Sequence, residues 1–168
     1  LRDLAAILRF ADELAEGIQR TSNFMQTYHK YSKRSMIYHK YAKATKVNID
    51  KEGGQVKLTY AISLTKKGKT FNKDVKSDFK ELMGYCYTRI VKLDQERKYN
   101  KFYCNDYLGE FQNTSVRFNI FVNNELTEVG LQDLELNDLT IPGDENKKIE
   151  VIDNDYKIDK ILKKLYAV

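Results

Sequence analysis

Hydrophobic residues change their spacing twice along this chain, and this change limits the folds that the chain can form. Every second residue is apolar or aromatic over residues 56–64, and the same alternation returns over residues 116–122. Between these segments, over residues 74–100, the apolar residues step by three and four instead. Alternation is typical of a strand with one wet face, whereas steps of three and four are typical of a helix. The order predicts an α+β fold, in which a long helix covers one face of an antiparallel sheet.

A tight turn joins the first two predicted strands, residues 47–50 and 55–64. The turn is Lys51-Glu52-Gly53-Gly54, whose two glycines allow the positive φ angles of a hairpin. A break near residues 43–46 divides a helical segment, residues 1–43, from an α+β domain, residues 44–168. The other predicted elements are three helices, residues 1–19, 21–32 and 155–166, and two strands, residues 130–139 and 148–152.

The first predicted helix carries a carboxylate on its apolar side. At about 100° per residue, one line along this helix is formed by Leu1, Leu4, Leu8, Ala11, Ala15 and Ile18. Asp12 projects beside that line, whereas Glu13 and Glu16 fall on the polar strip. Burying an unpaired carboxylate costs several kcal/mol. We therefore expect Asp12 to have a partner, which is a metal, a cation such as Arg20, or a set of hydrogen-bond donors.

The segment Leu8-Arg9-Phe10-Ala11-Asp12-Glu13-Leu14 resembles the late helix of HD-domain metal-dependent phosphohydrolases. It is also similar to the HD-like helical region of the exopolyphosphatase and guanosine-pentaphosphatase family. In HD enzymes that helix supplies the last ligand of a metal set made of a His, an adjacent His-Asp pair and an Asp. The resemblance implies that Asp12 binds a divalent metal (Mn, Mg or Fe). It also implies that the substrate is a nucleotide or another phosphate-containing small molecule.

The chain departs from the HD pattern in its histidines. His29 and His39 are both followed by lysine, and no His-Asp dipeptide occurs anywhere. We therefore expect the chain to be the C-terminal part of a longer protein, whose earlier ligands lie upstream of Leu1. On its own it should be catalytically inactive. The α+β domain is then expected to be a binding, regulatory or dimerising module.

Aromatic and basic residues are interleaved between the first helix and the hairpin. The motif Tyr-His-Lys-Tyr occurs at residues 28–31 and again at residues 38–41, and residues 30–80 hold a strong excess of lysine and arginine. Cations neutralise phosphates, while aromatic rings stack on bases. The candidate phosphate- or anion-binding residues are Arg20, Ser22, Lys33, Arg34, His39, Lys40 and Lys43.

Other interpretations fit the same residues. In one, a non-enzymatic module binds nucleic acid or a phosphorylated partner through residues 28–46. In another, the tyrosines of this segment are packed and its lysines are simply solvated. Apolar surface on the first helix also favours a homo-oligomer, in which a second copy covers it.

Composition and missing motifs exclude several classes of protein. The chain contains no P-loop, no dinucleotide-binding glycine motif, no nucleophile elbow and no His-Glu-x-x-His zinc motif. No apolar run approaches the roughly 20 residues that a membrane span needs, so we expect no membrane contact. Cys86 and Cys104, the only cysteines, lack metal-ligand spacing. Two such thiols favour a reduced, cytoplasmic protein.

Overall fold

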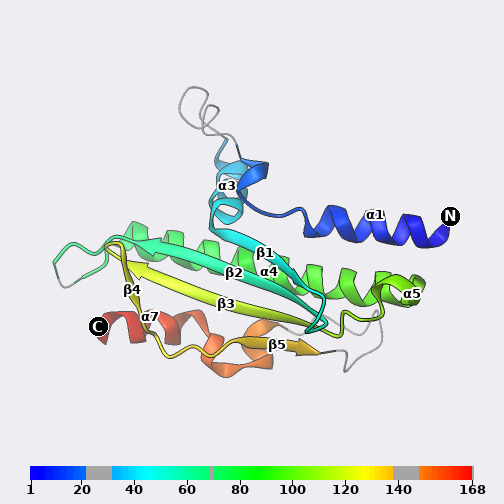
Figure 1. The fold of residues 1–168 in the computed structure, drawn as a ribbon. Coiled ribbons are helices and arrows are strands. Elements are labelled where there is room, and N and C mark those ends of the chain that lie inside the picture. Colours follow the sequence, from blue (N-terminus) through cyan, green and yellow to red (C-terminus); the bar gives the residue numbers. More distant parts are fainter. Residues whose placement is uncertain (22–31, 69, 138–147, 168) are drawn as a thin grey trace.

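The computed structural model describes residues 1–21, 32–68, 70–137 and 148–167 (Figure 1). The helices of these ranges are α1 (Arg2–Leu14), η1 (Ile18–Arg20), α3 (Lys33–Ala44), α4 (Lys73–Tyr103), α5 (Asn105–Leu108), α6 (Ile149–Ile152), η2 (Asn154–Tyr156) and α7 (Ile158–Ala167). The strands are β1 (Thr45–Asp50), β2 (Gln55–Leu64), β3 (Asn113–Val122), β4 (Glu125–Thr127) and β5 (Leu134–Asn137). The predicted α+β class is confirmed.

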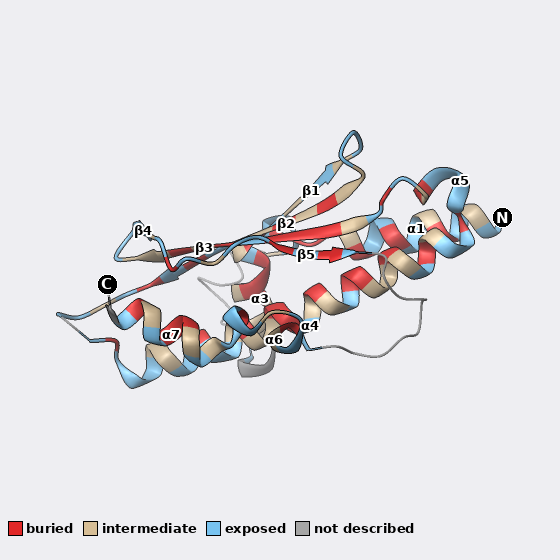
Figure 2. Cartoon of the chain, turned by 90° about the horizontal axis from the view of Figure 1, so that it is seen from below, coloured by how far each residue is buried: buried red, intermediate tan, exposed pale blue. Residues whose placement is uncertain are grey.

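The sheet has one covered face and one open face. α4 runs along the covered face (Figure 1), and α6 and α7 lie on the same side of the sheet (Figure 2). The alternation of β2 produces this asymmetry, because its apolar side chains point toward α4 and its polar side chains point away. The buried side chains of β2 are Val56, Leu58, Tyr60, Ile62 and Leu64. Apolar burial between sheet and helix is the main stabilising contribution to this fold.

The sheet differs from the expected antiparallel arrangement in its central pair. β1 pairs with β2, and β4 and β5 pair with β3, all in the antiparallel direction. The central strands β2 and β3 run parallel. The length of α4 explains the difference: 31 residues at 1.5 Å each extend about 46 Å, which carries the chain back past the start of β2. β3 therefore begins at the same end as β2, as in a βαβ crossover.

The predicted hairpin of β1 and β2 is confirmed. In its turn the Asp50 Oδ1 accepts a hydrogen bond from the Gly53 N–H at 2.9 Å, and the Asp50 Oδ2 lies 2.6 Å from the Lys57 Nζ. Gly54 has a φ of +61°, and a Cβ on it would lie 2.5 Å from the Glu110 carbonyl oxygen. Glycine at this position satisfies both a positive φ and a close backbone approach.

The buried ion pair of Arg97 and Asp94 on α4 is hydrogen-bonded to the strands that α4 covers. The Arg97 Nη2 donates to the Asp94 Oδ1 at 2.7 Å and to the Leu136 carbonyl at 3.3 Å. The Arg97 Nε donates to the Thr114 Oγ1 at 3.0 Å, and its Nη1 donates to the Phe111 carbonyl at 2.8 Å. These directional bonds join one turn of α4 to β3 and β5, so they fix where the helix lies along the sheet.

The shorter elements follow the sequence less closely. The predicted strand at residues 148–152 is instead the helical turn α6, in which the N–H groups of Val151 and Ile152 both bond to the Lys148 carbonyl. The predicted strand at 130–139 narrows to β5, and the predicted C-terminal helix is confirmed as α7. The predicted helix at 21–32 falls mainly outside the described residues. α3 lies almost wholly in the predicted helical segment 1–43 but was not predicted as a separate helix; Ser32 caps it by accepting a hydrogen bond from the Ser35 N–H.

Candidate functional site

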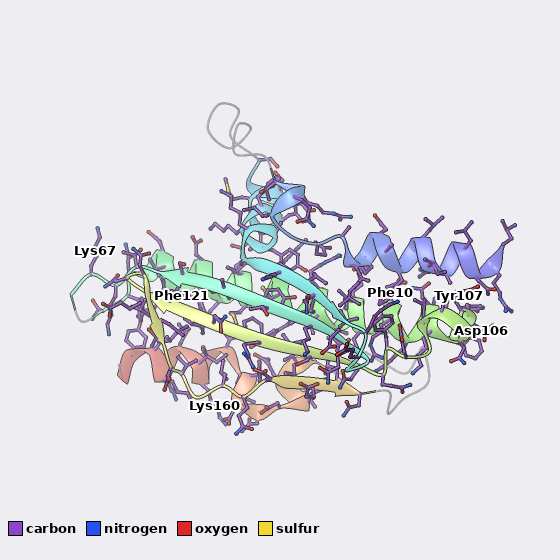
Figure 3. All side chains as sticks on the ribbon, in the orientation of Figure 1. Phe10, Lys67, Asp106, Tyr107, Phe121 and Lys160 are labelled. Carbon is purple, nitrogen blue, oxygen red and sulfur yellow. The ribbon has the colours of Figure 1, made fainter. Side chains whose placement is uncertain are left out.

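α1 packs on α4 with the side opposite to its line of leucines. Ala6, Phe10 and Glu13 are its buried residues, and the Phe10 ring points away from solvent toward Phe111, with centroids 6.4 Å apart (Figure 3). The line of leucines predicted to be buried faces solvent instead. Leu8, at the centre of that line, has an exposed fraction of 61%. The predicted burial of this face is therefore wrong for this structure.

Three pairs of opposite charges explain the orientation of α1. The Arg9 Nε and Nη2 donate to both carboxylate oxygens of Glu96, at 2.6 and 2.8 Å. The Lys92 Nζ lies 2.8 Å from the Glu13 Oε2, and the Arg89 Nη2 donates to Glu13 and to the Glu16 Oε1. We call the pairs Arg9–Glu96, Glu13–Lys92 and Glu16–Arg89 the charged ladder. Arg9 and Glu13 of α1, and Glu16 just after it, run antiparallel to their partners on α4.

The charged ladder was missed from the sequence, although a signal for it was present. Glu13 and Glu16 were expected to be solvated, yet both are buried. Buried carboxylates need cations at matching positions. α4 carries Arg89, Lys92 and Glu96 on one side. Their charges are opposite to those of Glu16, Glu13 and Arg9, taken in that order. A comparison of the charged sides of the two predicted helices would have found this match.

Asp12 is exposed rather than buried. The exposed fraction of its side chain is 83%, and the Arg20 Nη2 lies 3.2 Å from its Oδ1. One of the expected partners, the cation Arg20, is thus present. Within the described ranges, no three His, Cys, Asp or Glu side chains are placed to hold a metal. Asp12 therefore offers a single metal ligand here, and its metal role stays a prediction.

Arg20 links the end of α1 to α3. Its Nη2 also donates to the Asp12 carbonyl at 3.2 Å, and its Nη1 lies 4.0 Å from the Glu16 Oε1. A hydrogen bond with Tyr38 of α3 raises the pKa of Arg20, and the charges of Glu16 and Asp12 raise it further. The guanidinium is thus held between carboxylates. An incoming phosphate would share it with Asp12.

The other candidate cations lie on α3. The Lys40 Nζ pairs with the Asp78 Oδ2 on α4 at 2.7 Å. Lys43, almost one turn further on, is exposed and lines the clefts on both sides of its helix. Lys33 and Arg34 occupy the first turn of α3, but their side chains, like Ser22, lie outside the described part of the chain.

His39 is the buried member of the predicted set. Its exposed fraction is 9%, and its ring packs edge-on against Tyr38, with centroids 5.4 Å apart. Burial beside an aromatic ring limits the access of an anion to this imidazole. Its part in anion binding stays a prediction.

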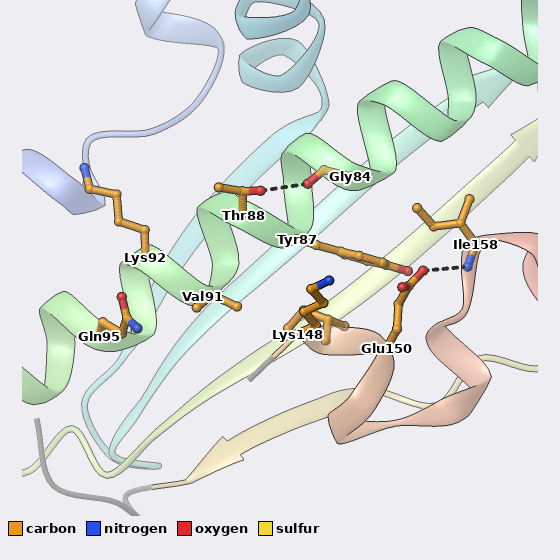
Figure 4. A pocket seen from close by; sticks show the side chains of 10 residues that line it. Gly84, Tyr87, Thr88, Val91, Lys92, Gln95, Lys148, Glu150 and Ile158 are labelled. Atoms are coloured by element: carbon orange, nitrogen blue, oxygen red, sulfur yellow. Dashed lines mark hydrogen bonds between the residues drawn. The ribbon is translucent and has the colours of Figure 1, made fainter. Parts of the chain in front are cut away.

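A cavity that no motif indicated lies between α4 and the α6–α7 region (Figure 4). Its volume is about 520 Å³, and Tyr87, Val91 and Ile158 form much of its wall. Lys148 and Glu150 also line it, and the Glu150 Oε1 accepts a hydrogen bond from the Ile158 N–H at 3.3 Å. Mostly apolar cavities of this size, with a few polar groups, suit small organic ligands. The cavity is the described feature of the α+β domain best suited to a ligand-binding role.

Comparisons with known proteins do not test the resemblance at residues 8–14. In the described ranges, no helix combines the length and the apolar character needed to cross a membrane. No family model, curated protein or solved structure matches the chain.

Proposed function

We propose that this chain is the C-terminal portion of an HD-type metal-dependent phosphohydrolase-like protein. In this proposal α1 is the late helix of the catalytic domain, and Asp12 is one of its metal ligands. The α+β domain is a binding, regulatory or dimerising module. One observation carries the proposal: α1 turns Asp12 and a line of leucines to solvent on the same side.

The exposed line has the spacing of a helix-packing face. Leu1, Leu4, Leu8 and Ala11 follow one another at intervals of three and four, which aligns them along one side of α1. The opposite side already packs on α4, so α1 has two packing faces, as does a helix inside a helical domain. A helix laid on the leucines would also remove water from Asp12. A desolvated carboxylate needs a nearby positive charge, and Arg20 or a metal ion supplies it.

The chemistry that follows is hydrolysis of a phosphate ester or anhydride. Asp12 and the histidine ligands would hold a divalent metal, whose charge would make bound water more acidic and polarise the phosphoryl group. Arg20 lies beside Asp12, where its planar guanidinium can bind a phosphate oxygen. In the parent protein, a His and a His-Asp pair upstream of Leu1 would complete the ligand set.

The test uses the parent protein encoded by the natural gene. Its translated sequence should contain a His and a later His-Asp pair before Leu1, and the purified protein should hold a stoichiometric divalent metal. Asp12→Asn should lose both metal and phosphatase activity, because an amide is a weak metal ligand. Asp3→Asn, a control on the same helix, should keep both. Full metal content in Asp12→Asn would contradict the proposal.

A non-enzymatic module that binds nucleic acid or phosphate anions is the alternative. It predicts binding to a single-stranded oligonucleotide that weakens steeply with salt. Binding should be lost on charge reversal of Lys33, Arg34, Lys40 and Lys43. We favour the first proposal because Lys40, one of these four cations, already pairs with the carboxylate of Asp78.

A further inference from the structure

β1 is an edge strand, and the covered side of the sheet is incomplete beneath it. Within the described ranges β1 pairs with β2 alone, so its other edge presents backbone N–H and C=O groups to an added strand. Val47 and Ile49 lie opposite Leu58 and Val56, which are fully buried. Ile49 nevertheless has an exposed fraction of 47%. Figure 1 shows β1 at the margin of the sheet, on the side where α1 lies.

A groove runs along this edge, between β1 and the C-terminal end of α1. Its volume is about 480 Å³, and its apolar wall is formed by Leu14, Ile18, Val47 and Ile49. The Thr45 end of β1 is already approached by Gly17, on which a Cβ would lie 3.3 Å from the Thr45 carbonyl oxygen. The part of the edge that a further strand can reach is therefore residues 46–50.

The sequence of this free edge is complementary to itself in the antiparallel direction. Lys46-Val47-Asn48-Ile49-Asp50 has Asn48 at its centre, a branched apolar residue on either side, and opposite charges at its ends. When two such strands are aligned with Asn48 opposite Asn48, Val47 faces Ile49 and Lys46 faces Asp50, each twice. We propose that a second copy of this chain pairs with β1 in this register and continues the sheet.

Both sides of the paired strands gain from this register. On the covered side, the Val47–Ile49 pairs extend the apolar wall of the groove. On the open side, Lys46 has no ion-pair partner among the described residues. Asp50 is bound by Lys57, and this hydrogen bond lowers the pKa of Asp50. The carboxylate is therefore charged at neutral pH and can accept a second lysine from the other copy.

The same pattern disfavours other registers. A shift by one residue would turn Val47 and Ile49 to the open face of the joint sheet. A shift by two residues would place Lys46 opposite Asn48 or beyond the strand, so the charge pairs would be lost. Five paired residues bury far less than the roughly 1,200 Å² of a stable interface. We therefore expect a dissociation constant on the order of 100 µM.

Charge reversal at the two ends of the strand tests the register. Lys46→Asp makes both ends acidic, and Asp50→Lys makes both ends basic, so each variant alone should associate about tenfold more weakly than wild type. An equimolar mixture of the two variants should associate as tightly as wild type, because opposite charges then face each other in both pairs. Sedimentation velocity from micromolar to millimolar concentration measures each association.

A matched control and the mixture keep the test independent of folding. Lys67→Asp makes the same charge change as Lys46→Asp, but in the loop after β2, at the end of that strand away from the β1–β2 turn (Figure 3). This variant should associate like wild type. Recovery in the mixture would show that both reversed variants are folded. The proposal is overturned if wild type stays monomeric at millimolar concentration, as it would if the edge took only a foreign peptide. It is also overturned if the single variants associate like wild type, as they would if the leucines of α1 formed the contact.

Discussion

Loss of the Arg89 guanidinium tests whether the charged ladder holds α1 on α4. The variant Arg89→Met keeps the apolar stem of the side chain and removes the charge. Glu16, whose side chain has an exposed fraction of 1%, accepts its hydrogen bond from Arg89. Glu13 keeps Lys92 at 2.8 Å. The variant therefore leaves one deeply buried carboxylate, that of Glu16, without its main partner.

The expected loss of stability follows from the burial of Glu16. Removing one partner of a buried pair costs about 3–5 kcal/mol, because the other charge stays buried without compensation. Arg20, whose Nη1 lies 4.0 Å from the Glu16 Oε1, remains as a more distant partner. We expect Arg89→Met to lower the free energy of unfolding by about 3 kcal/mol at pH 7.

Urea unfolding followed by circular dichroism at pH 7 measures this loss. Arg117→Met is the control, because Arg117 makes an equally close pair with Asp133, at 2.6 Å, on the surface. An exposed pair should cost less than about 1 kcal/mol to remove. Adding Glu16→Gln to Arg89→Met should recover more than half of the loss. Equal losses in Arg89→Met and Arg117→Met would refute the reasoning.

Three further predictions concern pH, backbone conformation and metal. The hydrogen bond from Arg9 lowers the pKa of Glu96. The stabilisation by the charged Glu96 is therefore present above the ordinary glutamate pKa and is lost as pH falls through the lowered pKa of the folded state. The difference in unfolding free energy between wild type and Glu96→Gln should vanish near pH 3. Gly54→Ala should cost about 2 kcal/mol in urea unfolding and Gly68→Ala about 1 kcal/mol, because both have positive φ but only Gly54 would bring a Cβ against a carbonyl. Adding Mn²⁺ should leave the melting temperature of this chain unchanged, because Asp12 is a single exposed ligand; a rise in a thermal scan would reveal ligands that the described residues do not provide.

The elements predicted well from the sequence are those whose hydrophobic period is long. The hydrophobic spacing repeats over residues 56–64 of β2, 116–122 of β3 and 74–100 of α4, so few other structures satisfy the pattern. α6 was predicted as a strand because five residues of alternating polarity also fit a helical turn. The parallel direction of β2 and β3 was missed for another reason. It depends on the end of the sheet to which α4 brings the chain, and the hydrophobic pattern of neither strand indicates that end.

The candidate site was harder to predict because its residues depend on contacts between elements. Arg20 was correctly named as a partner of Asp12, since two helical turns separate them and their charges are opposite. The pairing of Lys40 with Asp78 joins α3 to α4, and α3 was predicted only as part of the helical segment 1–43. The groove beside β1 has no motif at all. It exists because α4 lies beneath the middle of the sheet and leaves the edge strand partly uncovered.

The orientation of α1 carries the strongest argument for the proposed parent protein. Taken alone, the helix has one apolar line, and the ordinary rule places such a line inside. α4 binds the other side, because Arg9, Glu13 and Glu16 match its charges and Phe10 fills the contact. A helix with a matched charged side and a leucine side has room for two partners, and α4 is only one of them. If a second partner covers Leu4 and Leu8 in the parent protein, Asp12 becomes buried beside Arg20. The expectation of a buried, partnered Asp12 would then hold for the parent, although it fails for this structure.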